Sequence, residues 1–300
     1  MAGLLEPYAL GFMREAALVA LVVGVVAPAV GVWVSLRRMT YLGDAMSHGT
    51  LGGVGIAVLL GVDVVLGALG AGLLMAVGIG LLRRRPVIHG DAAIGICSVT
   101  LFALGVLLIS GGGVGVEISH FLFGQLITVD TGDLVLVTAL GAVAVGTLIV
   151  CFRDLELISL DPLHARQVGV RVGLMEAVLL GLVTVTVVLC LRSVGLLMSV
   201  AMLIVPANAA RLLARTTAGM TAIAVALGVT AALGGLTASY HLATSPGATT
   251  ALTAVGLLVL VLLGTWARTA RRRWWPGHEP IPVAVVDDER QASRTGGVIA

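Results

Sequence analysis

Residues 16–36 read AALVALVVGVVAPAVGVWVSL, an uncharged run that ends directly before Arg37 and Arg38. A helix of this length crosses the roughly 30 Å hydrocarbon core of a lipid bilayer. Further apolar runs of similar length follow at 62–82, 92–110, 134–152, 174–191, 193–213, 219–240 and 249–267. Residues 44–61 are an additional candidate, glycine-rich and apolar apart from four polar side chains. The sequence therefore predicts an all-α polytopic membrane protein with eight or nine transmembrane helices.

The composition excludes an ordinary soluble domain. Of the 300 residues, 58% are hydrophobic and 11% are charged, and the mean hydropathy is +1.09, far above the range of soluble chains. All eighteen basic residues are arginine, and the formal net charge is only +2. A charge this small gives no reason to expect nucleic acid as a partner. The expected surroundings are a lipid membrane.

The arginines between the apolar runs indicate how the chain crosses the membrane. If nine segments cross, most arginines fall on one side, which should be cytoplasmic; Arg14 and Arg192 are exceptions. The C-terminus is then cytoplasmic, and the side of the N-terminus depends on whether 44–61 crosses completely. We expect a transmembrane domain at 1–268 and a cytoplasmic polar tail at 269–300, in which no run of spanning length occurs.

Residues 41–49, YLGDAMSHG, place Asp44 and His48 four positions apart between two apolar runs. On a helix, both side chains point the same way. The same stripe continues with Gly52 and Gly55, so it is nearly bare and suits either close helix contact or an open passage. An acid inside a membrane segment is costly and usually functional, although an Asp–His hydrogen bond that merely helps helices pack is the simpler alternative.

A carboxylate and a neutral imidazole suit zinc, manganese or iron(II) better than copper(I), because no thiolate accompanies them. Tetrahedral geometry favours zinc slightly, with manganese next. Two ligands are too few for a site, and a second copy of the chain across a two-fold axis would supply the missing pair. Gly52 and Gly55 would then face a pore between the copies. The metal would be a transported substrate, and no permanently bound cofactor is expected.

Two other segments carry local signals. Asp161 is a good helix N-cap, Pro162 suits the first helical position and Gly169 suits the end, so a short helix is expected at 162–168. Pro206 interrupts the run 193–213 and is either a hinge or a static kink, while Asn208 can hydrogen-bond to a neighbouring helix. His120 and His241 lie on the proposed outer side, where ordinary interfacial roles are favoured over metal contact.

The chain carries no sign of being an enzyme. A Walker A loop needs a lysine to hold the nucleotide phosphates, and this sequence contains no lysine. Energy for transport must then come from another polypeptide. The competing interpretations are a proton-coupled secondary metal transporter, in which Asp44 and His48 carry protons, and a membrane scaffold that transports nothing.

Residues 41–57, YLGDAMSHGTLGGVGIA, resemble the signature of the membrane permeases of manganese and zinc ABC importers. Five further stretches match in the order of that family, namely DAAIGICSVTLFALGVLLIS at 91–110, HFLFGQLI at 120–127, DPLHARQVGV at 161–170, SVGLLMSVAMLIVPANAARLLAR at 193–215 and SYHLATSPGATTALTAVG at 239–256. These matches run through about 40–267. Several motifs in one order are a specific signal, whereas each alone would be weak.

The resemblance implies a bacterial ABC importer in which a homodimer of this permease sits on two ABC-type ATPase subunits. It also implies an extracytoplasmic metal-binding protein that delivers the metal. The embedded metal ligands of the family fall on Asp44 and His48. The short helix at 162–168 corresponds to the cytoplasmic coupling helix that contacts the ATPase, and the residues concerned are Asp161, Pro162, His164, Arg166, Gln167 and Gly169.

Overall fold

The structure, a computed structural model, describes residues 9–85, 87–88, 90–111, 131–193 and 195–273. Within these ranges the chain forms helices and no strand. The helices are α2 (Gly11–Leu36), α3 (Tyr41–Leu60), α4 (Val64–Leu82), α5 (Gly90–Gly111), α7 (Thr131–Leu160), α8 (Pro162–Gln167), α9 (Val172–Ser193), α10 (Leu196–Leu213), α11 (Thr217–Leu242) and α12 (Pro246–Arg273). The predicted all-α fold is confirmed.

Each predicted span overlaps a helix over most of its length, but the helices differ in how well they suit a membrane. By length and apolar composition, six of the described helices could cross one, and a seventh could if the two halves of α7 count as one span. Those halves, Leu134–Val150 and Phe152–Leu160, meet at an angle of 64°. α10 contributes only a shorter apolar helix, Met198–Leu213. The number of crossings therefore stays a prediction.

Short polar signals set several helix ends. The Asp63 carboxylate accepts hydrogen bonds from the backbone N–H groups of Val65 and Leu66 at the start of α4, at 2.8 and 3.4 Å. Gly61, with φ of +65°, ends α3 in the left-handed conformation that glycine tolerates. Gly61 at the end of α3 and Asp63 at the start of α4 therefore define the short connection between these two helices.

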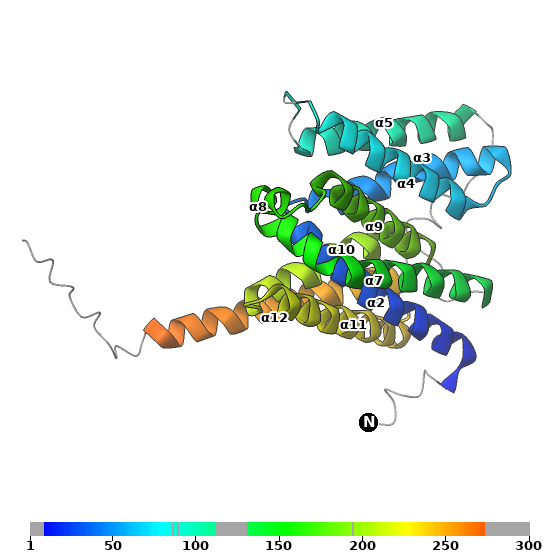
Figure 1. Cartoon of the computed structure of the whole chain (residues 1–300). Coiled ribbons are helices and arrows are strands. Elements are labelled where there is room, and N and C mark those ends of the chain that lie inside the picture. Colours follow the sequence, from blue (N-terminus) through cyan, green and yellow to red (C-terminus); the bar gives the residue numbers. More distant parts are fainter. Residues whose placement is uncertain (1–8, 86, 89, 112–130, 194, 274–300) are drawn as a thin grey trace, which may run out of the picture. The chain divides into compact units, whose positions relative to one another are not determined.

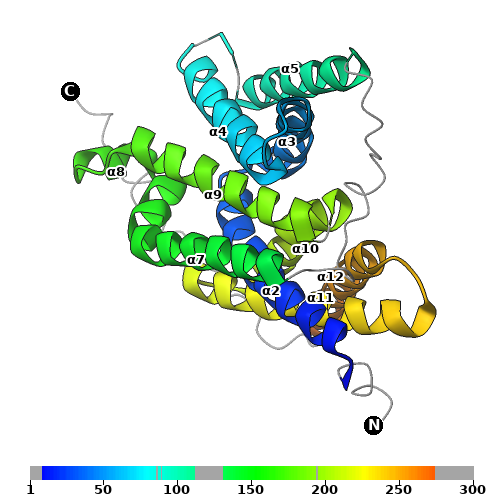
Figure 2. The same cartoon turned by 90° about the vertical axis from the view of Figure 1, so that its right-hand side faces the viewer.

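The chain divides into two compact units, Met1–Leu263 and Gly264–Ala300, with the boundary inside α12. The described part of the second unit, Gly264–Arg273, is the last part of that helix. The features below all belong to the first unit. In that unit α3, α4 and α5 form one group, and α9 lies between this group and α7 (Figures 1 and 2).

The core of the first unit forms around α2 and α9, the two most buried of the candidate spans. Trp33 on α2 is fully buried and meets the ring of Phe152 on α7 edge to face, with centroids 5.0 Å apart. Met46 on α3, Ile79 on α4 and Leu179 on α9 belong to the same buried cluster. This cluster joins the α3–α5 group to the rest of the unit, so α3 is held from several sides.

Candidate metal site and coupling segment

Asp44 and His48 meet on one face of α3, as their spacing predicts. The Oδ1 atom of Asp44 lies 3.6 Å from Nε2 of His48, and the two side chains are 36% and 41% exposed. α3 begins at Tyr41, three residues before the predicted start, so Asp44 falls in its first turn. The pair is therefore partly open on the surface of a single chain.

The first turn of α3 lies well inside the helix layer. Ser98 donates a hydrogen bond to the carbonyl oxygen of Ala45 at 2.9 Å, and it stands eight residues after the start of α5, or about 12 Å along a helix. On another side, Gly43 lies against Leu203 of α10, which continues ten residues further to Leu213, about 15 Å. Asp44 is thus recessed from the nearby ends of both neighbours.

α5 supports the pair through contacts that the sequence did not reveal. The ring of Phe102 meets the His48 imidazole edge to face, with centroids 5.6 Å apart and planes at 76°. Together with the hydrogen bond from Ser98, this contact fixes α5 beside the face of α3 that carries Asp44 and His48. An aromatic residue in an apolar run carries no signal of such a role.

The glycine stripe of α3 makes close helix contacts. A Cβ atom on Gly52 would lie 2.2 Å from the carbonyl oxygen of Leu101, and one on Gly105 would lie 2.4 Å from the Cα atom of Gly52. Gly52 therefore packs against α5 in this structure, as in the helix-contact alternative, and a pore between two copies stays a prediction. Gly55 is buried. Gly53 similarly faces Gly67 and Ala71 of α4, so α3 packs tightly on two sides.

Asp44 and His48 form a pair of two possible ligands in the single chain. Across the described residues, no group of three or more His, Cys, Asp or Glu side chains is placed to hold a metal ion. His241 is exposed at the end of α11 beside the ring of Tyr240. His120 lies outside the described residues. A complete site needs ligands beyond those that this part of one chain supplies.

The short helix predicted at 162–168 is present as α8, Pro162–Gln167. The Asp161 carboxylate accepts hydrogen bonds from the N–H groups of Leu163 and His164, both at 3.0 Å. At the other end Gly169 has φ of +90°, and Val170 N–H donates to the Ala165 carbonyl at 2.9 Å, which closes the helix. The function of this helix stays a prediction.

α8 presents most of its surface to solvent. His164, Arg166 and Gln167 are exposed, together with Leu163 and Val168, whereas Ala165 is buried against the unit. Exposed aliphatic residues beside charged ones suit contact with another protein. The geometry is that of a short projecting helix with one anchored residue.

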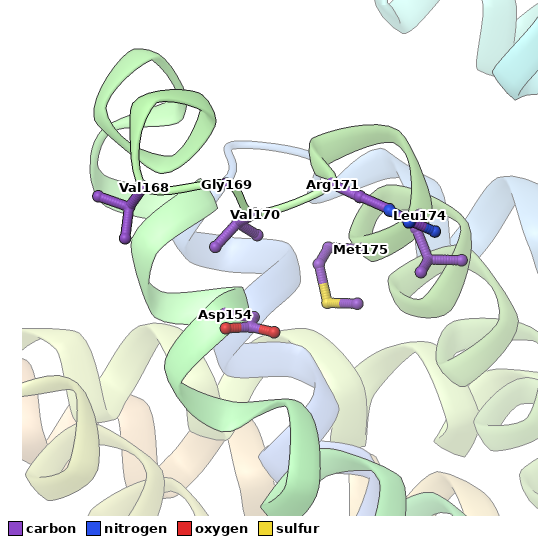
Figure 3. A pocket seen from close by; sticks show the side chains of 7 residues that line it. All are labelled: Asp154, Val168, Gly169, Val170, Arg171, Leu174 and Met175. Atoms are coloured by element: carbon purple, nitrogen blue, oxygen red, sulfur yellow. The ribbon is translucent and has the colours of Figure 1, made fainter.

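A pocket of about 390 Å³ opens beside α8. In Figure 3, Asp154 comes from the second half of α7, and Val170 and Met175 lie across the pocket from it. The other lining residues belong to the α8–α9 connection and the first turn of α9, namely Val168, Gly169, Arg171 and Leu174. The sequence did not predict this pocket, because its walls come from segments that meet only in the fold.

α10 continues as a helix through Pro206, from Leu196 to Leu213. The Asn208 side chain donates a hydrogen bond to the Ile204 carbonyl at 2.8 Å and accepts one from the Ser35 hydroxyl of α2 at 2.9 Å. The predicted bond from Asn208 to a neighbouring helix is therefore present. A hinge role for Pro206 stays a prediction.

Glu176 in the first turns of α9 lies in an ion-pair cluster with residues that are distant in the sequence. Its carboxylate pairs with Arg37 after α2 and lies 3.9 Å from Nη1 of Arg83 after α4. The ends of α2 and α4 and the start of α9 therefore share one side of the unit. This agrees with the expectation that the arginines in these connections lie together.

The fold and these features define a class of protein: an all-helical, multi-pass membrane protein with a short projecting helix between two of its long helices. The chain belongs to the ABC 3 transport family, which matches residues 9–265. It is therefore the permease component of an ABC transporter, in the cell membrane. The resemblance drawn from the sequence motifs is confirmed.

The names of individual relatives mention the metals that they transport. The chain is 36% identical over 250 residues to the manganese import system permease protein ScaB of Streptococcus gordonii, covering 83% of this chain and 90% of the relative. It is 31% identical over 259 residues to a probable iron transport system membrane protein of Haemophilus influenzae, covering 86% and 96%. Among solved structures, PsaBC from Streptococcus pneumoniae in complex with Fab superposes with a TM-score of 0.78 at 34% identity, covering 87% and 94%.

Proposed function

We propose that this chain imports a divalent transition metal into the cytoplasm, with manganese as its principal cargo. It would act as a homodimer on two ABC-type ATPase subunits and receive the metal from an extracytoplasmic binding protein. The observation that carries the proposal is the Asp44–His48 pair, recessed within the helix layer and partly open. Its carboxylate and imidazole supply oxygen and nitrogen ligands of the kind that these metals accept.

The number of ligands supports the homodimer. One chain offers two donor side chains at this position, 3.6 Å apart, whereas a metal site needs about four. A second copy across a two-fold axis adds an equivalent pair without any further residue type. The 36% and 41% exposure of the two side chains leaves them accessible to such a partner.

We propose manganese as the principal cargo because of the metals in the names of the relatives. The coordination argument from the sequence favoured zinc slightly, since a tetrahedral site suits that ion. The relatives described above are named for manganese and iron import. Carboxylate and imidazole bind all three metals, so we propose Mn²⁺ as the cargo and Zn²⁺ as a competitor whose transport must be compared directly.

The ATPase would act on the permease through α8. The chain lacks the lysine of a Walker A loop, so a separate ATPase must hydrolyse ATP. α8 exposes Leu163, His164, Arg166, Gln167 and Val168 on the side of the unit that holds the arginine connections. We infer that this side, and with it the C-terminus, is cytoplasmic. Metal bound between the two pairs would be released inward when the ATPase moves α8.

Radiolabelled manganese uptake tests the site. With the partner subunits coexpressed, Asp44→Asn should lower uptake by at least tenfold, because loss of a ligand should cost no less than the roughly 10–100-fold seen for groups that merely support ligands. Asp91→Asn is the matched control, since Asp91 is an exposed acid in the first turn of α5. Equal uptake by the two variants would remove Asp44 from the site.

The same assay separates the ABC importer from a proton-coupled secondary transporter. Depletion of ATP should stop uptake by the importer, whereas a protonophore at constant ATP should leave it running. Uptake that collapses with the proton gradient and continues without ATP would favour the secondary transporter. Membership in an ABC transport family supports the first result.

A further inference from the structure

We propose that Glu176 is a positioning residue that links α8 to the metal site through its ion pair with Arg37. The inference rests on the proposed import function and adds a route by which motion of α8 reaches Asp44 and His48. It begins with a contact between residues 139 positions apart in the sequence, whose side chains are 10% exposed for Arg37 and 32% for Glu176. Three parts of the fold meet at this carboxylate: the first turns of α9, the α2–α3 turn and the end of α4.

The first part of the route is the α8–α9 connection. Gly169 N–H donates to the Arg166 carbonyl at 3.2 Å and Val170 N–H to the Ala165 carbonyl at 2.9 Å. The N–H groups of Leu174 and Met175 then donate to the Arg171 carbonyl at 2.9 and 3.1 Å. Hydrogen bonds order both ends of this connection and only the Val170–Arg171 link joins them, so a displacement of α8 would be passed to the first turns of α9, where Glu176 lies.

The second part is the turn between α2 and α3. Arg38 N–H donates to the Ser35 carbonyl and Met39 N–H to the Val34 carbonyl, at 3.1 and 3.0 Å. Leu42 N–H donates to the Met39 carbonyl at 2.8 Å. Arg37 stands four residues before the start of α3 and seven before Asp44. A force applied to its guanidinium group therefore acts on the first turn of α3 through a closed turn.

The end of α4 is attached to the same point. Nη1 of Arg83 lies 3.9 Å from Glu176 Oε1 and 4.0 Å from the sulfur of Met39 in the α2–α3 turn. Charged groups at low exposure are stable only when they are paired. The carboxylate therefore holds α9, the α2–α3 turn and α4 together. Movement of α9 carries the Asp44-bearing turn of α3 with it while the cluster is intact.

The measurement is the number of manganese ions transported per ATP hydrolysed by the complete transporter in proteoliposomes. Glu176→Gln and Arg37→Gln should each lower this ratio by roughly fivefold or more, the lower end of ordinary coupling between sites. ATP hydrolysis should continue in both variants, and Mn²⁺ binding to the isolated transporter should persist. Arg38→Gln is the matched control, because it removes the same charge from the exposed neighbouring residue.

Exchange of the charges distinguishes coupling from mere loss of stability. Arg37→Glu alone should uncouple manganese transport from ATP hydrolysis. Arg37→Glu combined with Glu176→Arg should recover part of the number of manganese ions transported per ATP. Arg37→Lys, which keeps the charge, should stay close to wild type even if the exchanged pair does not fold. Wild-type ratios in both Gln variants would overturn the inference. A wild-type complex that hydrolyses ATP but moves no metal would instead overturn the proposed function.

Discussion

Phe102 packs against the His48 ring in the single chain. Its ring meets the imidazole edge to face across the α3–α5 contact, and such aromatic pairs are worth about 0.5–1.5 kcal/mol beyond the area that they bury. Phe102→Leu keeps an apolar side chain but removes this contact. We expect the imidazole to sample more orientations in this variant, which should weaken metal binding although neither proposed ligand is removed.

We expect the transport KM for Mn²⁺ to rise about two- to tenfold in Phe102→Leu, by conversion of that energy at 1.4 kcal/mol per factor of ten. Phe12→Leu is the matched control, because Phe12 is an exposed phenylalanine on α2. Initial uptake rates over a range of Mn²⁺ concentrations give the KM of each variant. An unchanged KM in Phe102→Leu would show that the ring does not position His48.

At the scale of the helices, α3 and α5 form a pair that depends on the absence of side chains. The Cα atom of Gly52 and the backbone of Leu101 and Gly105 approach so closely that a methyl group cannot fit. Close approach of this kind replaces the hydrophobic driving force that is missing between helices in lipid. The α3–α5 contact thus holds Phe102 in register with Asp44 and His48.

Gly52→Ala should destabilise the protein by about 1–3 kcal/mol, the usual cost of overpacking, and lower its Tm in detergent. Gly70→Ala on α4 is the control, since no atom lies within 4 Å of the added Cβ. Alanine is the better helix former by about 1 kcal/mol, so the Tm of that variant should stay or rise. The same loss in both variants would contradict a specific α3–α5 contact.

At the scale of the whole transporter, the proposed metal site requires two chains to act together. The single chain brings one Asp44 and one His48 to the same place. If four ligands bind one ion between two copies, damage to one copy destroys the shared site. If each copy transports alone, the undamaged copy keeps working.

A tandem fusion of two copies tests this difference. With Asp44→Asn in one half only, manganese uptake should fall as far as with both halves changed. Asp91→Asn in one half should leave uptake at the wild-type level, because that acid lies exposed on α5. About half of wild-type uptake in the single Asp44 variant would indicate independent sites and exclude the shared one.

Features that depend on neighbours along the chain were predictable. The apolar runs are as long as a membrane is thick, so the helices could be placed, and Asp161 and Gly169 bracketed α8 because a cap acts within one turn. The spacing of Asp44 and His48 put both on one face of α3 for the same reason. Family motifs in sequence order predicted the ABC permease.

Features that depend on distant contacts were decided only by the tertiary structure. Phe102 beside His48, Gly52 against α5 and Glu176 with Arg37 each join helices that the sequence separates. One more aromatic, glycine or acid in an apolar chain has the same local pattern wherever it packs. A side chain's partner is set by how the helices are arranged, whereas its helix is set by the residues next to it. The sequence therefore predicted that Asp44 and His48 share one helix face, but not which contacts hold them there.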